Sequence, residues 1–261
     1  MSFLVDLLFP PKCASCRSLL APELYGCQDL ALCEDCMKKW NSECLETCGI
    51  CAKKVNECFC VTEEMQKAKC KAFGKAVFYY GNHHGAVQNN LIFSLKERGA
   101  RRNLRFAANA LLPVLQRMIL DVSDFAKENA VFTYLPRTHR AKLAYGTDQA
   151  EELARALSQS SGIPVMRLVR RRWLIGKEQK RLSPAERTKN AQKSLVAVKH
   201  ADCQGKTVIV VDDIVTTGAG MAACARLLRS MGAREVLCLS LASDSVNRDK
   251  PIPDTRKNTP F

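Results

Sequence analysis

Residues 208–220 of this 261-residue chain read Val-Ile-Val-Val-Asp-Asp-Ile-Val-Thr-Thr-Gly-Ala-Gly. The two carboxylates, Asp212 and Asp213, are acceptors suited to a pair of ribose hydroxyls. The Thr- and Gly-rich residues that follow offer hydroxyls and backbone N–H groups at the start of an expected helix, where a phosphate is favoured. Diol acceptors beside phosphate donors indicate a ribose 5-phosphate site.

Two other interpretations of the same residues are possible. The aspartates could cap the next helix, a common role for Asp, or they could end a Walker B strand. The tripeptide Gly205-Lys206-Thr207 invites the second idea. A P-loop, however, needs a glycine at position 200, which is His, and its lysine follows a strand rather than preceding one. The sugar-phosphate interpretation is therefore favoured.

Cysteine is the second chemical signal, with 14 residues in the chain and 11 of them between positions 13 and 70. The spacing predicts two sets of four thiolates, each able to surround one tetrahedral Zn²⁺. The first set is Cys13, Cys16, Cys33 and Cys36, and the second is Cys48, Cys51, Cys58 and Cys60. The second set is less regular, because residues 58–60 form a Cys-x-Cys rather than a Cys-x-x-Cys. The remaining cysteines of this region, Cys27, Cys44 and Cys70, either bind no metal or replace one of these ligands.

Zinc in these sets would be structural, because four protein ligands leave no open position. Reduced structural cysteines are one alternative, and a redox Cys-x-x-Cys is another, although no thioredoxin-like βαβ pattern surrounds the pairs. About 60 residues with few large aliphatic side chains bury little surface, so bound metal would supply much of the stability.

The elements that must position these groups follow from periodicity. Strand 208–211, a helix with Met221, Cys224, Leu228 and Met231 on one face, and strand 236–241 form a strand–helix–strand unit, which predicts a parallel sheet. Further strands are expected at 75–80, 131–135 and 164–169. Helices are expected over 87–95, over 106–115 with Pro113 limiting or bending it, and from Thr147 or Asp148 to a stop at Gly162.

The chain is basic, with a formal net charge of +14, which favours polyanionic partners. Arg137 and Arg140 follow a strand and could hold a pyrophosphate, and a solvated basic turn is the alternative. Segments 98–105 and 167–181 are also basic, and the second contains Trp173, so they could bind single-stranded DNA. Core packing of that Trp, and a basic protein with no polymer partner, are the alternatives.

The chain ends carry little chemistry. Residues 1–9 are apolar but short and contain Asp6, so a helix packed on the body is expected rather than a signal peptide. No stretch is long enough to span a bilayer, and a cytoplasmic location is expected. Pro251, Pro253 and Pro260 lie among charged residues, which predicts a disordered tail.

The 208–220 segment resembles the PRPP-binding motif of type I phosphoribosyltransferases, and the whole chain resembles the ComF (ComFC or GntX-like) family. The resemblance covers that loop and the Cys-x-x-Cys pairs. It also covers Leu-Phe-Pro-Pro at 8–11, Leu-Lys-Glu-Arg-Gly at 95–99, Gly-Thr-Asp-Gln at 146–149, and Gln179-Lys-Arg-Leu with Glu186, Arg187 and Asn190. The family differs at three places: it usually has Thr or Ser at 220, Arg at 145 where this chain has Tyr, and Val-Pro-Val-Pro where 134–137 reads Tyr-Leu-Pro-Arg.

This resemblance implies an α/β fold, a type I phosphoribosyltransferase-like parallel sheet flanked by helices, behind a small Cys-rich zinc module. The expected boundaries are 1–65 for the module, 66–245 for the transferase-like domain and 246–261 for the tail. The expected site residues are Asp212, Asp213, Thr216, Thr217, Gly218, Ala219, Gly220, Arg137 and Arg140.

It also implies a phosphoribosyltransferase that binds PRPP with Mg²⁺, and a role in natural transformation through single-stranded DNA and a ComFA-type helicase. The alternatives are a PRPP-sensing module without turnover and a nucleic-acid-binding protein with a vestigial pocket.

Overall fold

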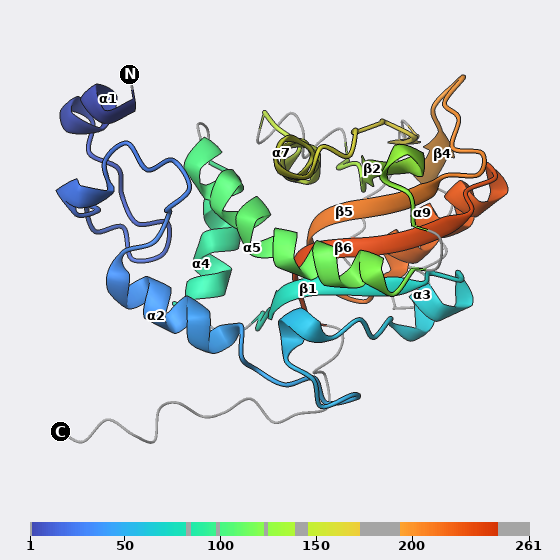
Figure 1. The fold of residues 1–261 in the computed structure, drawn as a ribbon, viewed down its shortest axis with the longest axis horizontal. Coiled ribbons are helices and arrows are strands. Elements are labelled where there is room, and N and C mark those ends of the chain that lie inside the picture. The colour runs from blue at the N-terminus through green and yellow to red at the C-terminus, as the bar shows by residue number, and fades with distance from the viewer. Residues whose placement is uncertain are drawn as a thin grey trace, which may run out of the picture.

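A computed structural model describes residues 2–81, 85–97, 100–122, 125–138, 146–172 and 194–244 (Figure 1). The strands are β1 Ala72–Phe78, β2 Ala130–Tyr134, β3 Val169–Arg171, β4 Leu195–Ala197, β5 Thr207–Val215 and β6 Glu235–Ser243. The α-helices are α1 Ser2–Leu8, α2 Glu34–Glu43, α3 Glu63–Lys67, α4 Val87–Ser94, α5 Arg101–Leu120, α7 Gln149–Ser161 and α9 Ala219–Ser230. Short 3₁₀ turns are η1 Pro22–Leu24, η2 Val55–Glu57 and η3 Lys127–Asn129.

The main sheet has the order β1-β6-β5-β2, and every neighbouring pair is parallel. Alternate residues of β5 point to opposite faces: Ile209 and Val211 pack with α5 and α7, whereas Val208 and Val210 pack with α9 and α3. Helices cover both faces of the sheet (Figure 1), which explains why its strands are continuous apolar runs rather than alternating ones. The predicted fold class, a parallel sheet flanked by helices, is confirmed.

The boundaries of the main strands were predicted less well than their existence. β5 runs to Val215, so both aspartates lie inside the strand rather than after it, and β1 begins three residues before the predicted position 75. Pro113 neither ends nor shortens its helix, because α5 continues to Leu120. Val114 and Met118, one and five residues later, are fully buried beside the sheet, and this packing offsets the one hydrogen bond that proline removes.

The strand predicted over 164–169 is wrong. Val165 forms an isolated bridge with Phe132, and only the last predicted residue, Val169, lies in a strand, β3, which pairs antiparallel with β4 in a separate two-stranded sheet. The helix stop was predicted correctly: Gly162 closes α7 with φ +72°, a left-handed conformation that favours glycine.

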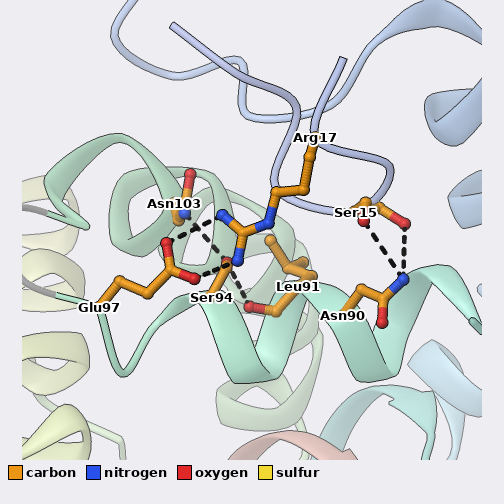
Figure 2. Close-up of polar contacts among 7 residues, drawn as sticks. All are labelled: Ser15, Arg17, Asn90, Leu91, Ser94, Glu97 and Asn103. Carbon is orange, nitrogen blue, oxygen red and sulfur yellow. Dashed lines mark hydrogen bonds and ion pairs between the residues drawn. The ribbon is translucent and has the colours of Figure 1, made fainter. Parts of the chain in front are cut away.

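The N-terminal segment packs on α4 and α5 through polar contacts (Figure 2). Arg17 forms a two-pronged ion pair with Glu97, and Asn90 Nδ2 donates to the Ser15 carbonyl at 3.3 Å and to its hydroxyl at 3.4 Å. Asn103 Nδ2 donates to Ser94 Oγ at 3.0 Å and so ties α5 to α4 beside the same contact. Residues 15–17 are therefore fixed to α4 and to Glu97, which follows it.

Helix α1 is attached by the charged Asp6 and by a ring contact between Phe3 and Tyr25, with 6.4 Å between ring centroids. The Asp6 carboxylate accepts from the Gly26 N–H at 2.8 Å and from Arg102 Nη2 at 2.6 Å, and these bonds lower the pKa of Asp6. Leu8 and Phe9 are each 75% exposed. The predicted short helix is therefore present and contacts the body, although most of its apolar side chains are exposed. No helix in the described ranges is both long and apolar enough to cross a membrane. The predicted tail, 246–261, lies outside those ranges, and the predicted domain boundaries stay predictions.

Candidate functional site

The carboxyl ends of β2 and β5 bring the predicted acidic and basic residues together. The two strands are parallel neighbours with Tyr134 opposite Val211, so residues just beyond each pairing lie at the same edge of the sheet. There Arg137 Nη2 lies 3.2 Å from Asp213 Oδ2, and the two side chains are only 17% and 14% exposed. The structure thus places a cation predicted for pyrophosphate directly beside a carboxylate predicted for ribose.

Asp212 occupies a more enclosed position than its neighbour. Burial, together with the adjacent negative charge of Asp213, raises the pKa of Asp212 well above its usual range. The N–H of Asp213 donates to Asp212 Oδ1 at 2.9 Å, and the N–H of Ile214 donates to Asp213 Oδ1 at 2.9 Å. These bonds hold both carboxylates against their own backbone, so the pair is ordered without a ligand.

Residues 216–220 turn from β5 into α9, as predicted. Thr216 is exposed, and Thr217 Oγ1 accepts from the Ala219 N–H at 3.3 Å. Gly218 is the residue before the helix and has φ +77°. A Cβ at this position would overlap the hydroxyl of Thr62, which caps α3. Glycine is therefore required by backbone conformation and by the approach of another segment, and not by a ligand alone.

Gly220 has a neighbour that the sequence did not indicate. A Cβ at this position would lie 2.7 Å from Leu135 Cδ2. Both residues are places where the chain differs from the ComF pattern, which has a hydroxyl residue at 220 and another sequence at 134–137. Leu135 stands where the ComF pattern has proline, and its side chain occupies the space that a side chain at 220 would need. Leucine at 135 and glycine at 220 are therefore compatible with one another.

Two further residues join this site. Asp148, at the start of α7, and Arg171, at the end of β3, both affect the charge around Asp212. Burial lowers the pKa of Arg171, while Asp212 and Asp148 oppose that shift. Sequence reasoning treated Asp148 as a helix cap and Arg171 as part of a DNA-binding segment. Only the tertiary contacts reveal their position: Arg171 Nε donates to the Pro136 carbonyl, and Asp148 Oδ2 accepts from the Arg137 N–H. Arg140, also predicted for pyrophosphate, and Tyr145 lie outside the described residues.

Both predicted cysteine sets are brought together. The four Sγ atoms of each set lie within 4.8 Å of one another. A tetrahedral zinc site with bonds of about 2.3 Å needs sulfur atoms nearly this close. The sets are Cys13, Cys16, Cys33 and Cys36, and Cys48, Cys51, Cys58 and Cys60. Cys27, Cys44 and Cys70 belong to neither set.

The clusters differ in their surroundings. Cys16 is exposed, and hydrogen bonds from Ser18 lower its pKa to about 6. Cys58 is buried, and Lys75 Nζ lies 3.1 Å from its Sγ. Lys75 is itself fully buried and also donates to the Cys58 carbonyl at 3.1 Å. The second cluster is thus built onto β1 through a buried cation, because Lys75 belongs to that strand.

The basic segments predicted for DNA are partly used within the protein. In segment 98–105, Arg102 pairs with Asp6 and Arg105 lies 2.7 Å from Asp29. In segment 167–181, Arg171 is directed into the site, whereas Arg170 and Arg172 are exposed. Trp173 lies outside the described residues.

Sequence comparison gives the class of the domain. The phosphoribosyl transferase domain family matches residues 146–258, which include β5, the loop and α9. Competence protein F of Haemophilus influenzae strain Rd is 29% identical over 109 residues, which are 41% of this chain and 48% of that protein. These matches support a ComF-family, phosphoribosyltransferase-like protein and confirm the resemblance drawn from the sequence. The matched region spans about half the length of that relative.

Solved structures give weaker likenesses. A purine phosphoribosyltransferase from Pyrococcus horikoshii is 18% identical, with 54% of this chain and 73% of that chain covered and a TM-score of 0.33. A glutamine PRPP amidotransferase from B. subtilis is also 18% identical, with 60% and 28% covered and a TM-score of 0.33. Scores at this level do not establish a shared fold.

Proposed function

We propose that the protein binds PRPP, or a related ribose 5-phosphate ligand, at the carboxyl end of β5. The observation that carries the proposal is the order of groups along one turn: two ordered carboxylates, then a hydroxyl- and glycine-rich loop, then the first residues of α9. Asp212 and Asp213 would accept from the ribose hydroxyls. Residues 216–220 would hold the 5-phosphate through hydroxyl and backbone N–H donors at a helix start.

The pyrophosphate end would lie near Arg137, and Arg140 is a second candidate. Arg137 pairs with Asp213, so the ligand would exchange this ion pair for an ion pair between the guanidinium and pyrophosphate and a hydrogen bond from a ribose hydroxyl to the carboxylate. The carboxylate oxygens also suit Mg²⁺, which would neutralise part of the pyrophosphate charge.

As a transferase, the protein would break the bond between C1 and the pyrophosphate oxygen, and the leaving pyrophosphate would take the electron pair. The oxocarbenium-like centre would be stabilised by fixed oxygens, and a nucleophile from an acceptor would attack C1. Release of pyrophosphate in the presence of candidate acceptors distinguishes this transferase from a PRPP-sensing protein.

The binding proposal is tested by calorimetry with PRPP and Mg²⁺. Asp212→Asn and Asp213→Asn should each weaken binding by about 10- to 100-fold, because a charge-assisted acceptor is worth roughly 1.5–3 kcal/mol. Asp121→Asn is the matched control, since Asp121 is an exposed residue at the end of α5. Unchanged affinity in both site variants would show that PRPP binds elsewhere.

A second function, binding of single-stranded DNA during uptake with a ComFA-type helicase as partner, is favoured by one observation. Arg170 and Arg172 are exposed on β3 and at its end, in a chain with a net charge of +14. The name Competence protein F, given to the relative, fits that role. The salt dependence of single-stranded DNA binding tests this function.

A further inference from the structure

The peptide group that joins Pro136 to Arg137 is held at both of its polar atoms. Arg171 Nε donates to the Pro136 carbonyl oxygen at 2.6 Å. The N–H of Arg137, on the other side of the same peptide bond, donates to Asp148 Oδ2 at 3.1 Å. One charged residue of each sign therefore fixes the plane of this single peptide group.

Both of these charged residues are themselves held in place. Arg171 Nη1 donates to Ser194 Oγ at 2.9 Å, and the Arg171 backbone pairs with Leu195, the next residue, at the end of the β3–β4 ladder. Asp148 is 5% exposed at the start of α7. The peptide group is thus attached to two elements, β3 and α7, that come later in the chain than β2 and its loop.

A fixed peptide plane fixes the point from which the Arg137 side chain starts, because its N and Cα atoms belong to that peptide group. Arg137 leaves this plane toward Asp213, with 3.2 Å between Nη2 and Oδ2. If the plane rotated, the guanidinium would swing away from the carboxylates. A guanidinium that is already oriented loses less conformational entropy when an anion binds.

We infer that Asp148 and Arg171 are positioning residues that aim Arg137 at the anionic leaving group of the ligand, acting through the backbone rather than by contact with it. This inference rests on the proposed function. On this inference, the hydrogen bonds of Asp148 and Arg171 to the 136–137 peptide group serve to orient the charge of Arg137.

The test compares three probes by calorimetry: PRPP, inorganic pyrophosphate and ribose 5-phosphate, each with Mg²⁺. Asp148→Ala and Arg171→Met should each weaken the binding of PRPP and of pyrophosphate by about tenfold. Each should change the affinity for ribose 5-phosphate by less than about twofold. Asp148→Asn keeps an acceptor for the Arg137 N–H and should restore most of the loss. Arg155→Met, an exposed change on α7, is the control.

A double-mutant cycle separates positioning from direct contact. In an Arg137→Gln background, Arg171→Met should cost less than about twofold in pyrophosphate affinity, because its effect passes through Arg137. An undiminished loss in that background would overturn the inference and mark Arg171 as a ligand contact. Amide exchange of Arg137 should speed up in Arg171→Met and in Asp148→Ala, and unchanged exchange would also overturn it.

The proposed function and this inference fail differently. A wild-type protein that binds neither PRPP nor ribose 5-phosphate overturns both. A wild-type protein that binds PRPP, with variants that bind it equally well, overturns only the positioning role.

Discussion

Lys75 is a fully buried cation whose described partners are one thiol sulfur, backbone carbonyls and the face of the Phe73 ring, whose centroid lies 4.9 Å from Nζ. A buried cation is costly unless an anion lies beside it. Cys58 Sγ, at 3.1 Å, becomes that anion when it is a metal-bound thiolate. The lysine and a metal in the second cluster would therefore stabilise each other.

Replacing this lysine should loosen the metal. Lys75→Met keeps the length of the side chain but removes the charge, and we expect zinc to leave the second cluster about tenfold more readily, the usual size of an outer-shell effect. Competition with a chromophoric chelator measures the release. Lys71→Met, an exposed change next to the same strand, should release zinc like the wild type. Equal release from both variants would remove Lys75 from the metal site.

Glu43 gives a prediction for pH. Burial first, and then the charge of Glu46, raise the pKa of Glu43 to about 7 from an ordinary value of 4.5. Between about pH 4.5 and 7 the folded protein holds a proton that the unfolded chain releases. The contribution of Glu43 to the free energy of unfolding therefore declines as pH rises through this range and is smallest above pH 7. Gln88 Nε2 donates to its carboxylate at 2.8 Å, a bond that a glutamine oxygen can also accept.

Glu43→Gln should therefore match the wild type in stability near pH 4.5 and exceed it at pH 8. The expected gain is roughly 1 kcal/mol, or about 2–4 °C in Tm. Thermal unfolding across this pH range measures it. The exposed Glu128→Gln should show no such trend, and a constant difference at all pH values would argue against the raised pKa.

At the scale of elements, the β2 end and the α9 start constrain each other through Leu135 and Gly220. Gly220→Ser should destabilise the protein by about 1–3 kcal/mol, because its Cβ meets Leu135 Cδ2 at 2.7 Å. Leu135→Ala should relieve much of this cost when the two changes are combined. Denaturant unfolding of the two single variants and the double variant gives the coupling energy.

Gly81 supplies the matched control for that cycle, since a Cβ there meets its nearest atom, Tyr79 Cε1, at an ordinary 3.6 Å. The changes in the free energy of unfolding caused by Gly81→Ser and by Leu135→Ala should be additive in the double variant. Additivity in the Gly220 cycle as well would mean that Leu135 moves aside at no cost.

The elements also show what the sequence could and could not predict. The apolar run at 208–211 and the cysteine spacing act locally, so the central strand and both clusters were found from them. The position of Arg171 depends on the pairing of β3 with β4, which joins residues on either side of the stretch 173–193. No periodicity in either three-residue strand is long enough to reveal that pairing. The contact between Gly220 and Leu135 joins residues 85 positions apart and has no local signal.

For the whole molecule, the two basic segments should differ in DNA binding. Arg105 is engaged with Asp29 and Gln28, whereas Arg170 and Arg172 are exposed. Replacing Arg170 and Arg172 together by Ala should reduce the log–log salt slope for single-stranded DNA by about 1.4, or roughly 0.7 for each lost phosphate contact. Fluorescence anisotropy at several salt concentrations measures the slope.

Arg105→Ala is the comparison for that experiment and should leave the slope nearly unchanged. Equal effects of the two replacements would indicate diffuse attraction to a basic protein rather than a site. If the protein binds no single-stranded DNA at physiological salt, only the proposed binding of PRPP would remain as a function.

The contact between the second cysteine cluster and β1 also concerns solubility. β1 is one of the two edge strands of the main sheet, and the N–H of Phe73 donates to the Phe59 carbonyl at 3.2 Å, in the segment between Cys58 and Cys60. An uncovered outer strand pairs readily with strands of other molecules. A metal that keeps 58–60 in place would thus protect the protein against self-association, and its loss would expose a template for aggregation before it disturbed the opposite end of the sheet.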